Sequence, residues 1–285
     1  MTPNLHALFG LKFNPFASNI PTESLWRTPS CEHFLWRIEN LVRDGGFALI
    51  SGDPGTGKSV TLRILAHHLA ALPDVRTGVL TRPQSGLGDF YRELGELFGV
   101  ALAPHNRWAG FRALRATWIS HVEATRWRPV LLIDEAQEVP APVLAELRIL
   151  AATDFDSHSI LTVILCGDER LTRAFRRDEL LPIASRLRVR LSLDYLPPKD
   201  LLAWLTHVLE QAGNPKLMSL EVMTTLAEHA AGNLRVLATM GNELLAMAAR
   251  RELPLIDQKL YFEVFATEPR PRPRRSATTN QHAQP

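Results

Sequence analysis

The segment from Gly52 to Ser59 carries residue types that bind the phosphates of a nucleotide. It fits the pattern G-x-x-x-x-G-K-[ST], in which backbone N–H groups surround phosphate oxygens and glycines permit their close approach. Lys58 is expected to reach the β- and γ-phosphates, and the Ser59 hydroxyl is expected to bind Mg²⁺. An apolar run precedes this segment and a helical pattern follows it, which is the context that the chemistry requires.

A pair of carboxylates, Asp134 and Glu135, follows the apolar run Val130–Ile133. A buried strand of this length brings Asp134 to the C-terminal edge of a parallel sheet, where ligands bind. We expect Asp134 to hold Mg²⁺ through water and Glu135 to orient or deprotonate an attacking water. An Asp-Glu pair, rather than Asp before an apolar residue, favours hydrolysis over nucleotide holding. The predicted nucleotide-binding residues are Gly52, Asp53, Pro54, Gly55, Thr56, Gly57, Lys58, Ser59, Val60 and Asp134.

Short apolar strands alternate with amphipathic helices between residues 46 and 196. The expected strands are 47–50, 76–81, 130–133, 160–166 and 188–193, and the expected helices are 31–42, 60–72, 89–98, 111–123 and 143–150. Such alternation predicts a parallel sheet with helices on both faces, which is a three-layer αβα domain of the α/β class.

Composition shifts mark three further parts of the chain. Residues 1–45 are predicted to be an N-terminal extension that packs on the core of domain 46–196, with 1–19 extended because Pro interrupts the apolar residues. Residues 197–267 show helical patterns only, which predicts a small helical domain. Residues 268–285 are rich in Arg and Pro with almost nothing to bury, which predicts a disordered basic tail.

The overall composition is that of an ordinary globular protein. The 285 residues carry 32 Lys and Arg against 30 Asp and Glu, so any nucleic-acid binding must come from local patches. Two distant cysteines exclude a disulfide framework. No apolar stretch reaches the roughly 18–20 residues that a membrane span needs, and no secretory signal is visible. These features predict a cytoplasmic protein without a membrane partner.

The phosphate loop, the Asp-Glu strand end and the helical C-terminal part together resemble an AAA+ ATPase. More narrowly, Phe9–Phe16 and the Asp134–Gln137 segment resemble the ExeA-like group, which includes the TnsC- and TniB-like ATPases that regulate DNA transposition. The resemblance covers roughly residues 8–265. It implies a P-loop AAA+ fold with a helical lid, ATP and Mg²⁺ as cofactors, and a homo-oligomer, either a ring or a filament. It also implies double-stranded DNA, a transposase and a target-selector protein as partners.

The same resemblance implies three further site residues. Arg186, just before the last strand, resembles the arginine finger supplied to a neighbouring subunit, with Arg188 and Arg190 as competitors. Arg235 in the Gly232–Arg235 segment resembles the second sensor, near the phosphates. Asp168 stands where many relatives carry Asn or Thr as the first sensor. The catalytic set is then Glu135, Lys58, Arg186 and Arg235.

Arginines in two places are candidates for contact with DNA phosphates. Arg82 follows the second strand, and Arg107 and Arg112 belong to a stretch interleaved with tryptophans. The alternative for this stretch is a solvated helix face with core tryptophans. The tail arginines from 270 onward are a further candidate.

Three functions remain open on these grounds. The first is an ATP-dependent regulator that assembles on DNA and links a transposase to its target. The second is a secretion-associated ATPase, which is less favoured because those relatives carry a membrane segment and a cell-wall-binding extension. The third is a scaffold that binds ATP without hydrolysing it, against which Glu135 and Arg186 argue.

Overall fold

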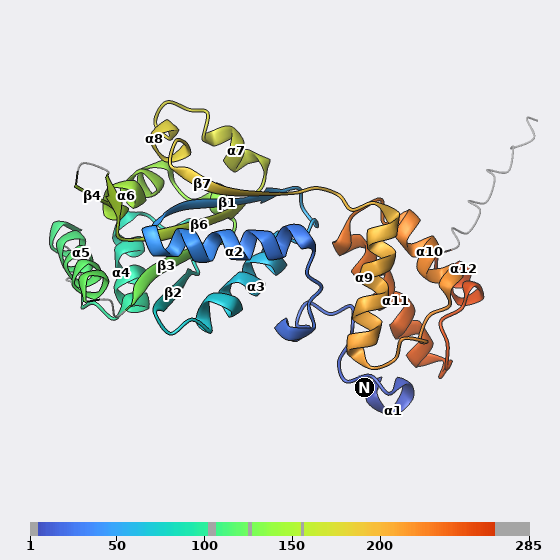
Figure 1. The fold of residues 1–285 in the computed structure, drawn as a ribbon. Helices are drawn as coiled ribbons and strands as arrows, with labels where there is room; N and C mark the ends of the chain where they lie inside the picture. Colours follow the sequence, from blue (N-terminus) through green and yellow to red (C-terminus); the bar gives the residue numbers. More distant parts are fainter. Residues whose placement is uncertain (1–4, 102–106, 125–126, 155–156, 266–285) are drawn as a thin grey trace, which may run out of the picture.

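A five-stranded parallel sheet forms the centre of the N-terminal domain (Figure 1). The computed structural model describes residues 5–101, 107–124, 127–154 and 157–265. The strands lie in the order β2-β3-β6-β1-β7, and every neighbouring pair is parallel. Their bounds are β1 Gly46–Gly52, β2 Val75–Leu80, β3 Arg128–Ile133, β6 Thr162–Gly167 and β7 Leu187–Leu193.

Helices cover both faces of this sheet. Leu131 and Ile133 of β3 face one core, while Val130 and Leu132 face the other, as the two-residue period of a strand requires. One layer contains α2 Pro29–Asp44 and α3 Lys58–Ala70. The other contains α4 Leu87–Phe98, α5 Arg107–Glu123, α6 Ala141–Ala151, α7 Glu169–Ala174 and α8 Leu181–Ala184. The predicted αβα fold with a parallel central sheet is confirmed.

Short elements that the sequence patterns did not predict complete this domain. They are the 3₁₀ turns η1 Thr22–Ser24 and η2 Ala136–Glu138 and the two-residue strands β4 Ala152–Thr153 and β5 His158–Ser159. The turn η2 matters for the site because it follows directly on Glu135.

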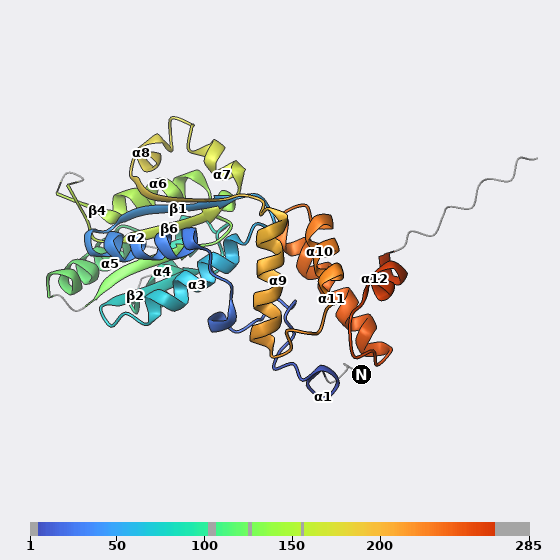
Figure 2. The same cartoon turned by 45° about the vertical axis from the view of Figure 1, so that its right-hand side comes forward.

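A helical part follows β7 and has a core of its own. It contains α9 Pro198–Ala212, α10 Leu220–His229, α11 Leu234–Arg250 and α12 Gln258–Phe265. Its helix starts are fixed locally, since Ser219 and Asn233 each accept hydrogen bonds from backbone N–H groups of the first turn. Figures 1 and 2 show this part beside the αβα domain, on the side toward which β1 and β7 run.

The N-terminal segment differs from its prediction. It begins with a helix, α1 Leu5–Phe9, and Phe9, Leu11 and Phe16 join the core of the helical part rather than that of the αβα domain. The Lys12 N–H donates to the Ala212 carbonyl oxygen at 2.8 Å. Only the later residues of the 1–45 extension, including α2, pack on the sheet. Four helices leave apolar surface that this segment covers, which the local sequence pattern does not reveal.

Two further predictions concern the chain ends and membranes. The expected basic tail, 268–285, lies outside the described residues. Within the described ranges, every helix falls short of the length and apolar content that crossing a bilayer demands.

Candidate nucleotide site

The phosphate loop leaves the C-terminal end of β1 and enters α3. Gly55 and Gly57 have φ values of +88° and +97°, in the left-handed region that glycine adopts without steric cost. Gly57 precedes the first turn of α3, so free N–H groups and the positive end of the helix dipole meet at the loop. Gly52 is also restricted, because a Cβ there would lie 2.4 Å from the Leu193 carbonyl oxygen.

Lys58 is the first residue of α3 and is only 8% exposed. Its Nζ donates to the Asp53 carbonyl oxygen at 2.9 Å, and the Thr56 hydroxyl donates to the same oxygen at 2.8 Å. The lysine charge therefore lies across the loop, within reach of an anion that the loop surrounds. Ser59 and Val60 follow it at the helix start, and both are exposed.

Asp134 lies at the end of β3, half-buried, as the apolar run predicts. One of its carboxylate oxygens accepts a hydrogen bond from the Glu135 N–H at 2.9 Å. On the adjacent strand β6, burial and then the Asp134 charge raise the pKa of the Cys166 thiol, so this cysteine stays protonated. An exposed hydroxyl at Ser59 and a carboxylate at Asp134 are hard oxygen donors, which fit Mg²⁺.

Glu135 is exposed and has a left-handed backbone, with φ of 50° and ψ of 41°. For a residue with a Cβ, this conformation costs roughly 1–2 kcal/mol. This left-handed conformation turns the chain from the end of β3 into η2. Backbone strain that the surrounding structure holds in place is common at functional sites.

Gln137 holds the Glu135 carboxylate and was not among the predicted site residues. Its Nε2 donates to Glu135 Oε2, and its Oε1 accepts from the Asp168 N–H at 3.1 Å. A Cβ at Gly167 would lie 2.7 Å from Gln137 Oε1, so glycine there makes room for this amide. The Asp134–Gln137 motif includes Gln137, but the role of this residue depends on its contact with Asp168, 31 residues away.

Asp168 caps the start of α7, and the contacts of its carboxylate are local. Its carboxylate accepts from the Arg170 N–H at 2.8 Å and also pairs with Arg170 Nε at 2.9 Å. Arg170 in turn pairs with Glu138 of η2 at 2.9 Å. The first-sensor role expected for Asp168 stays a prediction, although Asp168 and Glu135 line the same cavity.

That cavity has a volume of about 1100 Å³ and lies between the αβα domain and the helical part. It brings together Lys58, Ser59, Glu135 and Arg235 from three distant segments of the chain. Arg235 belongs to the first turn of α11 and is exposed there. The sequence reasoning missed the apolar part of the lining, which includes Ile20, Leu25, Trp26, Tyr195 and Trp204.

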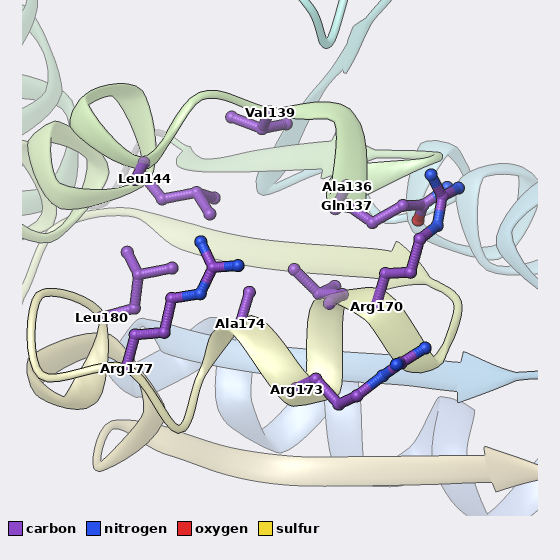
Figure 3. Close-up of a pocket in the computed structure, with 11 residues that line it drawn as sticks. Ala136, Gln137, Val139, Leu144, Arg170, Arg173, Ala174, Arg177 and Leu180 are labelled. Carbon is purple, nitrogen blue, oxygen red and sulfur yellow. The ribbon is translucent and has the colours of Figure 1, made fainter.

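A smaller groove of about 400 Å³ lies behind the wall of this cavity, between η2, α6 and α7 (Figure 3). Figure 3 shows Gln137 and Arg170 facing each other at one end and Arg177 extending toward Leu144 at the other. Arg170 lines both hollows. Arg170, which pairs with Glu138 of η2, is therefore part of the partition between them.

Arg186 lies far from the phosphate loop of its own chain. It directly precedes β7, whose Leu187 pairs with Phe47 at the start of β1, whereas Leu193 pairs with Gly52 at the end. Six residues of strand separate the two edges by about 20 Å. Its guanidinium donates to the Pro182 carbonyl oxygen. The competitor Arg190 donates to the Ala184 carbonyl oxygen at 3.2 Å, on the same side of the sheet as α8.

The arginines proposed for DNA contact have different surroundings. Arg82 and Arg112 are exposed, whereas Arg107 forms an ion pair with the buried Glu146 at 2.5 Å. Arg115 donates to three carbonyl oxygens at the end of α6, including that of Leu150 at 2.9 Å. Trp118 is fully buried, while Trp108 is 67% exposed. Of the core tryptophans that the alternative expects, Trp118 is buried and Trp108 is not. Contact of Arg82, Arg107 and Arg112 with DNA stays a prediction.

Parts of this chain are similar to known proteins. Residues 42–175 match the family model described as an AAA domain. General secretion pathway protein A of Aeromonas hydrophila is 28% identical over 210 residues, which cover 72% of this chain and 37% of that protein. The chain thus spans little more than a third of this relative's length.

Solved structures resemble the chain in fold. The Aeropyrum pernix ORC2 protein in ADPNP–ADP complexes aligns with a TM-score of 0.70 at 15% identity, covering 89% of this chain and 70% of that one. The Aeropyrum pernix ORC1 protein in complex with DNA aligns with a TM-score of 0.64 at 17% identity, covering 88% and 68%. The protein has the P-loop AAA+ fold.

The partial domain match and the likeness to general secretion pathway protein A agree with the resemblance to AAA+ ATPases of the ExeA-like group. Proteins of the AAA+ ATPase class bind a nucleotide, usually with Mg²⁺.

Proposed function

We propose that this chain binds and hydrolyses ATP in the cavity between its two parts. The observation that carries the proposal is that Lys58, Glu135 and Arg235 line one cavity although they come from separate segments. The two cations offset charge on the phosphates, and the Glu135 carboxylate faces the same space. Ser59 and Asp134 would hold Mg²⁺, which supplies further charge neutralisation when bound.

The reaction assigned to this site is displacement at the γ-phosphorus by water. The water oxygen forms the new P–O bond, the bond to the β,γ-bridging oxygen breaks, and its electron pair leaves with ADP. Glu135 orients the water and accepts its proton. Gln137, which donates to that carboxylate, fixes where the base lies.

The site is completed by Arg186 of a neighbouring copy. Its position at the opposite edge of the sheet prevents it from reaching the phosphates of its own chain, as the pairing of β7 with β1 indicates. In a homo-oligomer, ring or filament, that guanidinium would stabilise transition-state charge on the γ-phosphate. Bound ATP then favours assembly by mass action, and hydrolysis releases it.

A mixing experiment tests this arrangement. Lys58→Ala removes nucleotide binding but keeps the arginine, whereas Arg186→Ala keeps nucleotide binding and removes the arginine. Each variant alone should hydrolyse ATP at least about a hundredfold more slowly than the unaltered chain. A one-to-one mixture should regain activity, because some interfaces then contain one intact half from each. A mixture as inactive as its parts, with Arg186→Ala still binding ATP, contradicts the shared site. Unchanged turnover of Arg186→Ala alone points instead to Arg188 or Arg190.

For the biological role, we propose regulation of DNA transposition. The oligomer would assemble on double-stranded DNA and link a transposase to a target or target-selector protein, in the cytoplasm. The resemblance of Phe9–Phe16 and Asp134–Gln137 to the ExeA-like group, which includes the TnsC- and TniB-like ATPases, supports this role. So does the fold shared with an ORC1 protein solved in complex with DNA. Arg82 and Arg112 are exposed and can meet phosphates.

Filter binding with duplex DNA, with and without ATP, tests the role. ATP should tighten binding, and Arg82→Ala with Arg112→Ala should weaken it by about tenfold and flatten its salt dependence. Arg177→Ala is the matched control, an exposed arginine that lines the groove of Figure 3. DNA affinity that does not respond to ATP would sink the transposition proposal and leave the ATPase proposal intact.

The likeness to general secretion pathway protein A favours a second candidate, an ATPase of envelope secretion. The two roles differ in their partners rather than in the nucleotide chemistry. Genes beside this one separate them: a transposase of the retroviral-integrase type supports the first role, and envelope-secretion genes support the second. The third candidate, the non-hydrolysing scaffold, makes a different prediction. The chain would assemble with ATP, and the Glu135→Gln variant would form assemblies with the same lifetime as those of the unaltered chain.

A further inference from the structure

The first turn of α11 lies directly against the phosphate loop. Asn233 Nδ2 donates to the Pro54 carbonyl oxygen at 3.1 Å. The next residue adds a second contact, since the Leu234 N–H donates to the Gly55 carbonyl oxygen at 3.0 Å. These two bonds join segments 179 residues apart. The helical part is thus hydrogen-bonded to the backbone of the loop itself.

Asn233 serves two purposes with one side chain. Its Oδ1 accepts from the Arg235 N–H at 3.0 Å and from the Val236 N–H at 3.2 Å, so it caps α11. Its Nδ2 remains for the loop. The contact leaves no spare room, because a Cβ at Gly55 would lie 2.1 Å from Asn233 Oδ1.

The turn that carries Asn233 is itself fixed. Gly232 has φ of +86°, and a Cβ there would lie 2.6 Å from the Tyr195 Cβ. The Gly232 carbonyl oxygen accepts from the Leu196 N–H at 3.1 Å. Asn233 is therefore anchored to the segment that leads from β7 into α9, and it presents its amide from a defined position.

Holding these carbonyl groups determines how the loop can bind an anion. In a planar trans peptide the C=O and the following N–H point in opposite directions. Fixing the Pro54 carbonyl therefore fixes the Gly55 N–H, which belongs to the set of backbone donors that a phosphate would use. The same turn carries Arg235, which lines the cavity.

We propose that Asn233 is a positioning residue that holds the phosphate loop in its binding conformation and couples that loop to the helical part. The inference rests on the proposed nucleotide binding and adds to it how the two domains share the site. Phosphate binding and placement of Arg235 then depend on the same turn of α11. A loop loosened from α11 binds nucleotide more weakly, although Lys58 and the glycines are intact.

The variant Asn233→Ser isolates this role. Serine is also a good helix cap, so α11 keeps its start, but its hydroxyl is too short to reach the Pro54 oxygen. Calorimetric titration with Mg·ADP should show about tenfold weaker binding, while the melting temperature stays unchanged. Ser219→Ala is the control, because it removes the cap of α10 away from the loop. It should lower the melting temperature and leave ADP affinity unchanged.

A second readout needs no nucleotide. Hydrogen–deuterium exchange of the segment 52–60 should be faster in Asn233→Ser than in the unaltered chain, because the loop loses the hydrogen bond from Asn233 to the Pro54 oxygen. If the unaltered chain binds no ADP, the proposed function fails, and exchange alone then tests whether Asn233 holds the loop. Exchange and ADP affinity that both equal those of the unaltered chain overturn the inference.

Discussion

Two ion pairs in the αβα domain look alike from their arginines and differ in their carboxylates. Arg107 and Arg170 are 56% and 58% exposed, yet Glu146 is 7% exposed where Glu138 is 35%. The exposure of an arginine therefore does not tell whether its charge is available to a ligand. The burial of the partner carboxylate decides whether the arginine is available, because a buried carboxylate needs the arginine as its counter-charge.

The Arg107 pair belongs to the packing of α4, α5 and α6. Glu146 also accepts a hydrogen bond from the Tyr91 hydroxyl at 2.5 Å, and burial followed by this bond raises the pKa of Tyr91. The hydrogen bond that Arg107 donates to Glu146 likewise raises the pKa of Arg107. A carboxylate inside the protein needs both donors, because an unpaired buried charge is costly.

Arg170 lies instead on the partition between the nucleotide cavity and the groove of Figure 3, since it lines both. Arg170 has two carboxylate partners, Asp168 and Glu138, each at 2.9 Å. Water reaches the pair, so either contact can break at little cost. Such a pair can respond to a ligand, whereas the Arg107 pair holds helices together.

The largest expected effect is that of breaking the buried pair. Glu146→Ala should lower the free energy of unfolding by about 3 kcal/mol, because Tyr91 and Arg107 lose their acceptor and a cavity opens. Urea unfolding followed by circular dichroism measures this loss. Glu146→Gln keeps the shape and an acceptor, so it should lose less. An alanine variant within 0.5 kcal/mol of the unaltered chain, roughly the scale of surface substitutions, would remove the distinction between the pairs.

The parts of the site that could be predicted from the sequence are those whose geometry is set by residues close together in the chain. The phosphate loop is encoded locally, since Gly55 and Gly57 supply left-handed backbone and Lys58 starts the next helix. Asp134 and Glu135 follow a buried strand, whose apolar run fixes where it ends. In each case the residues that determine the geometry lie within a few positions of one another.

The features that the sequence did not reveal depend on distant partners. Gln137 meets Asp168, and Asn233 meets Pro54 across 179 residues. The N-terminal segment covers helices that begin about 190 residues later, with the Asn214 amide donating to the Phe9 carbonyl oxygen at 2.9 Å. The sequence makes Arg107 a candidate for contact with DNA, because no residue near it in the chain indicates that it pairs with Glu146. A single sequence shows a residue's chemistry but not its distant partner.

The smallest expected effect concerns the exposed pair and sharpens the comparison most. Glu138→Gln removes one of the two carboxylates on Arg170 and leaves Asp168 at 2.9 Å, so the fold should lose little. The melting temperature should stay within about 2 °C of the unaltered chain.

Hydrolysis should respond more than stability does. With Glu138 released, Gln137 is left to tie η2 to α7, and Gln137 also holds the Glu135 carboxylate. We expect kcat to fall by less than about fivefold with KM unchanged, because Glu138 contacts Arg170, which links η2 to α7, and does not contact the nucleotide. Steady-state ATP hydrolysis measures both constants. A rise in KM alone would mean that the partition shapes nucleotide binding rather than the position of the base, and a large drop in melting temperature would mean that the two pairs are structurally equivalent.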